Sequence, residues 1–170
     1  MPPGSYERFP LSIVLLSNAL AMSIYTIGAC ILAGFGLWVV VLYLLYCLWV
    51  EFRILKKSCV NCYYYGKRCG LGKGRVCSLL LTQGVPSDFA SKQISWWGIL
   101  PDFMVSIVPL IVGTVQLARG WSWLLIALLA ALLVLSSAGN AVVRGQFLCR
   151  YCRQREIGCP AEKLFSGVKK

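Results

Sequence analysis

A run of 41 residues without a charged side chain, from Pro10 to Val50, is the strongest constraint on how this chain folds. As one helix it would be about 60 Å long, roughly twice the hydrocarbon thickness of a bilayer. Two membrane-spanning helices joined by a tight turn fit the same run, and Gly34 and Gly36 permit the backbone angles that a reversal needs. We therefore predict helices over about 10–30 and 35–54.

A second apolar block covers about 101–143 and contains only two charged residues, Asp102 and Arg119. Arg119 and the glycine after it divide the block, and Trp121 and Trp123 follow, a combination typical of a helix turn at a lipid interface. We predict helices over about 100–118 and 121–143. With 14% charged residues, against roughly 25% in soluble domains, the chain is expected to be an all-α integral membrane protein with four transmembrane helices in two hairpins.

The charges indicate an orientation. The 17 Lys and Arg residues outnumber six Asp and Glu. Loop 51–101 holds eight cations and two carboxylates, and tail 144–170 holds seven and two. By the positive-inside rule, both termini and the central loop face the cytoplasm, and the protein lies in the cell membrane. The same cations meet anionic lipid headgroups. Binding of nucleic acid is disfavoured because no nucleic-acid motif accompanies the charge.

The cysteines form an internal repeat. Cys59, Cys62 and Cys69 have the spacing C-x2-C-x6-C, and the same spacing returns 90 residues later. The second copy consists of Cys149, Cys152 and Cys159. Each copy follows a predicted hairpin, so we expect two tandem repeats, 1–80 and 100–170, with cysteine motifs 59–77 and 149–159. Two spans per unit give both halves the same orientation, related by a pseudo-twofold axis along the membrane normal.

The linker between the repeats is residues 81–99. Its segment 85–99 has the pattern of a short helix that lies on the cytoplasmic membrane surface, with Ser87 as the expected cap.

Paired cysteines two residues apart are typical of a metal site. With Cys77 the first motif supplies four thiolates, enough for a tetrahedral zinc or an iron–sulfur cluster, and the second supplies three. Two arrangements are open: one metal per motif, or one ion shared by Cys59, Cys62, Cys149 and Cys152. The candidate ligands are Cys59, Cys62, Cys69, Cys77, Cys149, Cys152 and Cys159. Glycines within the first motif permit positive φ angles that turn backbone amides toward sulfur (Gly66, Gly70, Gly72 and Gly74).

Two other cysteine chemistries compete with metal binding. Structural disulfides are disfavoured in a reducing cytoplasm. Thiol–disulfide exchange through a C-x-x-C pair is an alternative. Cys30 and Cys47 fall within predicted helices and are expected to be small apolar residues there.

We expect the metal module to be structural or electron-transferring, and the protein to be a membrane anchor or accessory subunit for a cytoplasmic partner. No general base or nucleophile dyad indicates an enzyme, and any reaction would be an oxidation or reduction. The alternative is electron transfer between an iron–sulfur centre and a membrane quinol. The polar residues inside the predicted helices either join helices or line a quinone pocket. They are Ser17, Asn18, Ser23, Thr26, Ser106, Thr114, Gln116, Ser136, Ser137 and Asn140.

Overall fold

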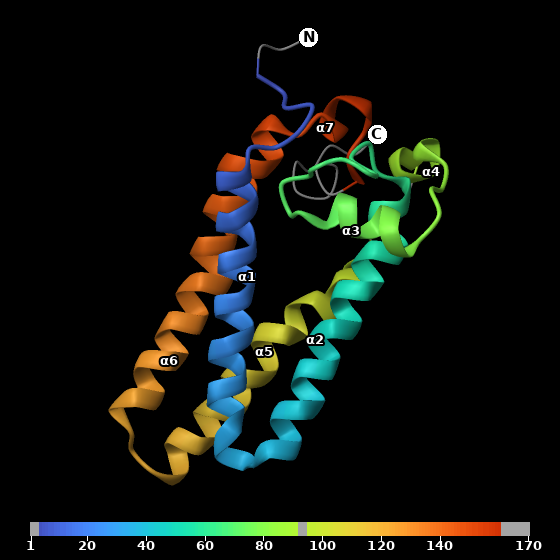
Figure 1. The fold of residues 1–170 in the computed structure, drawn as a ribbon. Helices are drawn as coiled ribbons and strands as arrows, with labels where there is room; N and C mark the ends of the chain where they lie inside the picture. The colour runs from blue at the N-terminus through green and yellow to red at the C-terminus, as the bar shows by residue number, and fades with distance from the viewer. Residues whose placement is uncertain (1–3, 92–94, 161–170) are drawn as a thin grey trace.

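The computed structural model describes residues 4–91 and 95–160, and its regular structure there is helical apart from one isolated bridge between Tyr6 and Cys152. Four helices are long and apolar enough to cross a membrane, which confirms the four predicted spans (Figure 1). They are α1 (Leu11–Leu32), α2 (Leu37–Lys57), α5 (Trp96–Arg119) and the segment Trp123–Tyr151, which begins with α6 (Trp123–Val134). α5 begins four residues before its predicted start.

Two tight turns close the hairpins at the end of the bundle opposite the cysteines, here called the hairpin end (Figure 1). The first is the short helix η1 (Ala33–Phe35), and Gly36 after it has a φ of 112°, which only glycine adopts without strain. The turn therefore lies where the glycines predict it. At the second turn, the Ser122 hydroxyl accepts a hydrogen bond from the Leu125 amide and caps α6.

The fourth spanning segment is not a uniform α-helix. After α6 it continues as two stretches of the wider π-helix, η3 (Leu135–Gly139) and η4 (Ala141–Leu148). Ser136 and Ser137 donate to the Leu133 carbonyl, and Asn140 donates to the Ser136 carbonyl at 3.2 Å. Side chains that bond to backbone carbonyls in this way compete with the regular helical pattern, which explains the change of pitch.

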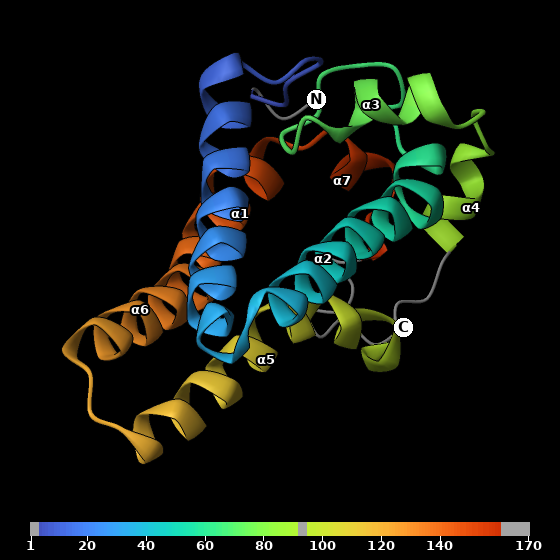
Figure 2. The same ribbon diagram turned by 60° about the horizontal axis from the view of Figure 1, so that its bottom comes forward.

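Helices α1 and α5 form the central pair of the bundle, and α2 and α6 pack on the outside against both of them (Figure 2). Small residues allow the close contacts. A Cβ on Gly28 would lie 2.3 Å from the Tyr43 hydroxyl, and one on Gly113 would lie 2.6 Å from Leu129. The core between the helices consists of Ile24, Ile31, Leu32, Tyr43, Cys47, Val50, Val105 and Leu132.

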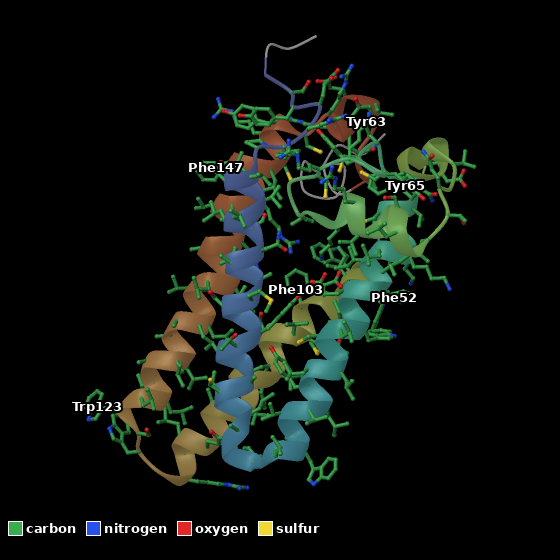
Figure 3. All side chains as sticks on the ribbon, in the orientation of Figure 1. Phe52, Tyr63, Tyr65, Phe103, Trp123 and Phe147 are labelled. Carbon is green, nitrogen blue, oxygen red and sulfur yellow. The ribbon has the colours of Figure 1, made fainter. Side chains whose placement is uncertain are left out.

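The outer surface of the bundle is apolar. In the most hydrophobic stretch of each span only 11–17% of the residues are buried, so most of these side chains face outward, as lipid contact requires. Trp123 lies at the hairpin end, and Tyr63 and Tyr65 lie at the opposite end (Figure 3). Aromatic side chains at both ends match the belts found at membrane–water interfaces.

The end of the bundle opposite the hairpin turns, here called the cysteine end, carries the two cysteine motifs and several short helices (Figure 1). These helices are η2 (Cys59–Asn61), α3 (Lys73–Leu80), α4 (Pro86–Ser91), η5 (Cys149–Tyr151) and α7 (Gln154–Ile157). The predicted interfacial helix over 85–99 corresponds in part to α4. Residues 92–94 of that prediction lie outside the described residues.

Candidate metal centre

The two Cys-x2-Cys segments have the same backbone path. Each opens with a single turn of 3-10 helix, η2 or η5, directly after a membrane-spanning segment. In the first, the Cys62 amide donates to the Cys59 carbonyl at 3.3 Å, and in the second the Cys152 amide donates to the Cys149 carbonyl at 3.3 Å. The second cysteine of each pair is then extended, with φ and ψ of −85° and 148° at Cys62 and of −82° and 117° at Cys152.

Backbone amides point at the second thiol of both motifs. The Tyr64 amide lowers the pKa of Cys62 and the Gln154 amide lowers that of Cys152, in each case from two residues further along and against the larger effect of burial. Amides placed in this way stabilise a thiolate and orient it, as the outer hydrogen bonds of metal sites do. The two segments therefore share the local geometry of a sulfur ligand as well as its spacing.

Gln154 joins the two motifs directly. Its side chain is 3% exposed, its Oε1 accepts a hydrogen bond of 2.7 Å from the Tyr63 amide, and its Nε2 donates to the Gly158 carbonyl. Both polar atoms of this buried amide are thus satisfied, one by each motif.

The segment before α1 passes between the motifs. The Tyr6 amide donates to the Tyr151 carbonyl at 3.0 Å, and the Phe9 amide donates to the Arg68 carbonyl at 3.0 Å. Phe9 is 1% exposed. The residues before the first membrane helix therefore bind motif 2 at one point and motif 1 at the next, and hold the two together.

Tyr64 is the centre of this junction. It is 1% exposed, its hydroxyl donates to the Tyr6 carbonyl at 2.6 Å, and it accepts from the Arg153 amide at 3.0 Å. Its ring packs against Phe9 and Tyr63, with centroids 5.5 Å and 5.1 Å away. The Tyr63 ring in turn lies beneath two cations, with Lys67 Nζ at 4.1 Å and the Arg153 guanidinium at 5.3 Å from its centroid.

Thiols of the two motifs are electrostatic neighbours. Burial raises the pKa of Cys62 to about 11, and the thiols of Cys69, Cys159 and Cys77 act in the same direction. Burial raises the pKa of Cys152 to about 12, with contributions from Cys62, Cys159 and Cys149. The charges that act on Cys62 therefore include thiols of both motifs.

The third cysteine of motif 1 also accepts a backbone amide. The Gly74 N–H lies 3.3 Å from the Cys69 sulfur. The glycine prediction is confirmed in part, because Gly66 and Gly72 have positive φ angles of 71° and 74°, whereas Gly70 and Gly74 do not. At Gly74 the reason for glycine is space, since a Cβ there would lie 2.2 Å from the Tyr64 carbonyl oxygen.

The remaining cysteines are less central. Cys77 is fully buried, donates to the Leu55 carbonyl at 3.8 Å, and has its pKa raised by burial and by Cys69. Cys59 is half-buried and Cys149 is exposed. Inside the bundle, Cys47 is buried as expected, whereas Cys30 is exposed. No disulfide joins any of the nine cysteines, and across residues 4–91 and 95–160 no three His, Cys, Asp or Glu side chains converge closely enough to hold a metal ion.

Sequence reasoning missed the residues that join the motifs. The three consecutive tyrosines Tyr63–Tyr65 follow a predicted helix, and nothing in their sequence marks one of them as the buried residue at a junction. No sequence pattern marks Tyr6, Phe9 or Gln154 as contacts between the motifs. Single aromatic or amide residues near a terminus occur for many reasons. Comparison of the chain with family models, with curated proteins and with solved structures gives no match, so its function is argued from this site alone.

Proposed function

We propose that this chain is a small polytopic membrane protein that carries a cysteine-ligated metal, zinc or iron–sulfur, on the cytoplasmic side of the cell membrane. It serves as a membrane anchor or accessory subunit for a cytoplasmic partner. The observation that carries the proposal is the pair of docked Cys-x2-Cys turns, each with an amide directed at the second sulfur. Gln154 and Tyr64 join the two turns, so cysteines of both motifs lie at the same end of the bundle.

The ligand set that fits this arrangement best is the second and third cysteine of each motif. Cys62 and Cys152 have an amide at the sulfur, and Cys159 is an electrostatic neighbour of both. Cys69, like Cys77, also acts on Cys62, and it accepts the Gly74 amide. The remaining candidates, Cys59, Cys77 and Cys149, then surround the site without ligating.

Metal binding would close this site. A thiol with a pKa near 11 is protonated at neutral pH, so an incoming ion displaces the proton and gains a thiolate in exchange. The basic residues around the motifs offset the negative charge of a thiolate-rich centre, whichever metal it holds.

The packing of the helices supports the repeat that this ligand set requires. In a pseudo-twofold arrangement α1 corresponds to α5, and α2 to the segment that begins with α6. The contacts agree with that correspondence. The contact of α1 with α2 matches that of α5 with α6, and the contact of α2 with α5 matches that of α6 with α1. Lys163, which repeats Lys73 at the offset of 90, lies outside the described residues.

Metal analysis of Cys→Ser variants tests the ligand set. Protein purified without oxygen should contain one zinc ion or one iron–sulfur centre per chain. Cys62→Ser and Cys152→Ser should each lower metal affinity by more than about tenfold, because a ligand matters at least as much as its outer hydrogen bonds. Cys30→Ser is the matched control, because that thiol is exposed and lies on α1, and it should keep full metal content. Full retention by Cys152→Ser would show that motif 1 binds alone, and metal-free wild-type protein would refute the proposal.

Labelling of thiols tests the orientation. The exposed Cys149 should react with a membrane-impermeant maleimide in inside-out vesicles but not in intact cells, because the cysteine end carries the cations. Trp121→Cys at the hairpin end is the control and should react in intact cells. Labelling of Cys149 from outside the cell would invert the topology, and would place the thiols where disulfides persist.

Electron transfer between an iron–sulfur centre and a membrane quinol is a second candidate, and the cavity described below favours it. The metal distinguishes the two functions. Brown protein that contains iron and sulfide supports electron transfer, whereas colourless protein with stoichiometric zinc excludes it. Rapid alkylation of Cys62 and Cys152 without any chelator would instead support thiol–disulfide exchange.

A further inference from the structure

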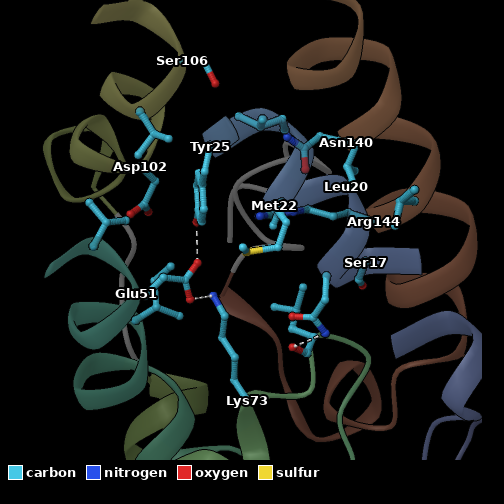
Figure 4. Close-up of a pocket in the computed structure, with 18 residues that line it drawn as sticks. Ser17, Leu20, Met22, Tyr25, Glu51, Lys73, Asp102, Ser106, Asn140 and Arg144 are labelled. Carbon is cyan, nitrogen blue, oxygen red and sulfur yellow. Dashed lines mark hydrogen bonds and ion pairs between the residues drawn. The ribbon is translucent and has the colours of Figure 1, made fainter. Parts of the chain in front are cut away.

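A cavity of about 310 Å³ lies between the membrane helices, next to the cysteine end (Figure 4). All four spanning segments contribute to its wall. So do Leu71 and Lys73, which lie in the chain from Cys69 to the start of α3, here called the loop of motif 1. Its volume is at the lower end of the roughly 300–1,000 Å³ typical of small-molecule sites. Four of the polar residues that the sequence placed inside the helices line it: Ser17, Asn18, Ser106 and Asn140.

The loop of motif 1 covers the cavity on the side of the cysteines. The buried Ser17 hydroxyl donates to the Gly70 carbonyl at 2.8 Å, and the Asn18 amide nitrogen lies 3.4 Å from the Leu71 carbonyl oxygen. Leu71 and Lys73 of this loop are themselves part of the wall. Met22, also on the wall, is 61% exposed on the flank of α1, so the cavity reaches the surface within the membrane-spanning region.

Both carboxylates of the cavity are already paired. Glu51 accepts a hydrogen bond from the Tyr25 hydroxyl and forms an ion pair with Lys73 (Figure 4). Asp102 forms an ion pair with Arg53 at 3.1 Å. The sequence places Glu51 and Asp102 simply at helix ends, but the packing turns both toward the interior.

Arg144 is the cation on the cavity wall that forms no ion pair with these two carboxylates. It lies on η4, lines the cavity, and extends across it toward Met22 (Figure 4). Within the described ranges no carboxylate lies at ion-pair distance from its guanidinium. Arg144 as a residue is exposed, and its guanidinium, which extends over the cavity, is a charged donor within reach of a ligand held there.

We propose that this cavity binds the head group of a membrane quinone. A quinone is dissolved in the lipid phase, its ring suits the size of the cavity, and it carries acceptor oxygens on opposite sides. One oxygen accepts from the Arg144 guanidinium, and the other accepts from the Lys73 ammonium, which keeps N–H donors beyond its ion pair with Glu51. A phospholipid phosphate is the competing ligand, and its charge would meet Arg144 alone, because Lys73 and Arg53 already neutralise Glu51 and Asp102.

Binding of a quinone in this cavity does not depend on the metal. Quinone affinity is measured on the full chain in lipid nanodiscs, with a short-chain ubiquinone analogue as the probe. Arg144→Gln should weaken binding by at least about tenfold, the loss expected for one hydrogen bond from a charged donor. Arg119→Gln removes the same charge at the hairpin end and should bind as the wild type does.

A second variant keeps the proposal testable if Arg144→Gln does not fold. Ala21→Phe fills the cavity without changing its charge and should reduce binding to the same degree. Unchanged affinity in both variants, or an equal loss in Arg119→Gln, would overturn the inference, as would displacement of the probe by phosphatidylglycerol. Cys62→Ser, measured in parallel, should lose metal and keep the quinone, which separates failure of the metal centre from failure of this site.

Discussion

Replacing Gly74 by alanine is expected to open the cysteine end. The added Cβ would lie 2.2 Å from the Tyr64 carbonyl oxygen and 2.5 Å from that of Lys67, both backbone atoms that cannot rotate away. Relief of the clash breaks the hydrogen bonds from the Gly66 amide to the Gly74 carbonyl and from the Gly74 amide to Cys69. We expect a loss of about 3 kcal/mol in the local stability of this loop.

Alkylation of Cys77 measures this opening, because its thiol is fully buried and lies three residues after Gly74 in α3. A loss of about 3 kcal/mol raises the population of the open state, and with it the rate of alkylation, by roughly a hundredfold. Peptide mapping by mass spectrometry separates Cys77 from the other thiols. Gly98→Ala is the control, because a Cβ at that helical glycine meets no atom within 4 Å. Equal rates of Cys77 alkylation in the two variants would contradict the expectation.

Replacing Tyr64 by phenylalanine is expected to separate the two motifs. The change keeps the ring but removes the hydroxyl that donates to the Tyr6 carbonyl and accepts from the Arg153 amide. Two buried backbone groups then lack a partner, at a cost of about 2 kcal/mol in the free energy that docks the motifs. The N-terminal segment and motif 2 should therefore detach from motif 1 more often.

Hydrogen exchange at single amides measures this detachment. The Arg153 and Tyr6 amides should exchange roughly thirtyfold faster in Tyr64→Phe, the ratio that corresponds to 2 kcal/mol. Tyr65→Phe is the matched control, because its hydroxyl donates at 2.7 Å to the Leu81 carbonyl, away from motif 2. If both variants protect these two amides as well as the wild type does, Tyr64 does not hold the motifs together.

These two residues show where sequence reasoning stops. Gly74 was expected to act through its φ angle, whereas the structure shows a close backbone approach, which depends on where residues 64–67 return. Tyr64 belongs to a run of three tyrosines whose sequence does not say which one is buried. Its two partners are 58 and 89 residues away, so no local pattern identifies them.

The helices and their turns followed from the sequence, because they depend on local quantities: the length of uncharged segments against the thickness of a bilayer, and glycine where the chain reverses. Those quantities predict the four spans and the turn at Gly36. The pitch of the fourth span was not predicted, because it depends on how Ser136, Ser137 and Asn140 compete with the backbone.

The spacing of the cysteines likewise marks the two motifs, but their meeting and the cavity beside them arise from packing. Glu51 joins Tyr25 from another helix and Lys73 from the loop of motif 1, and the Tyr63 amide meets Gln154 across 91 residues. Such contacts form between segments far apart in the chain, and their geometry is set by how the four helices pack. The sequence shows which chemical groups each residue offers. The tertiary packing of the four helices determines which other residues those groups contact.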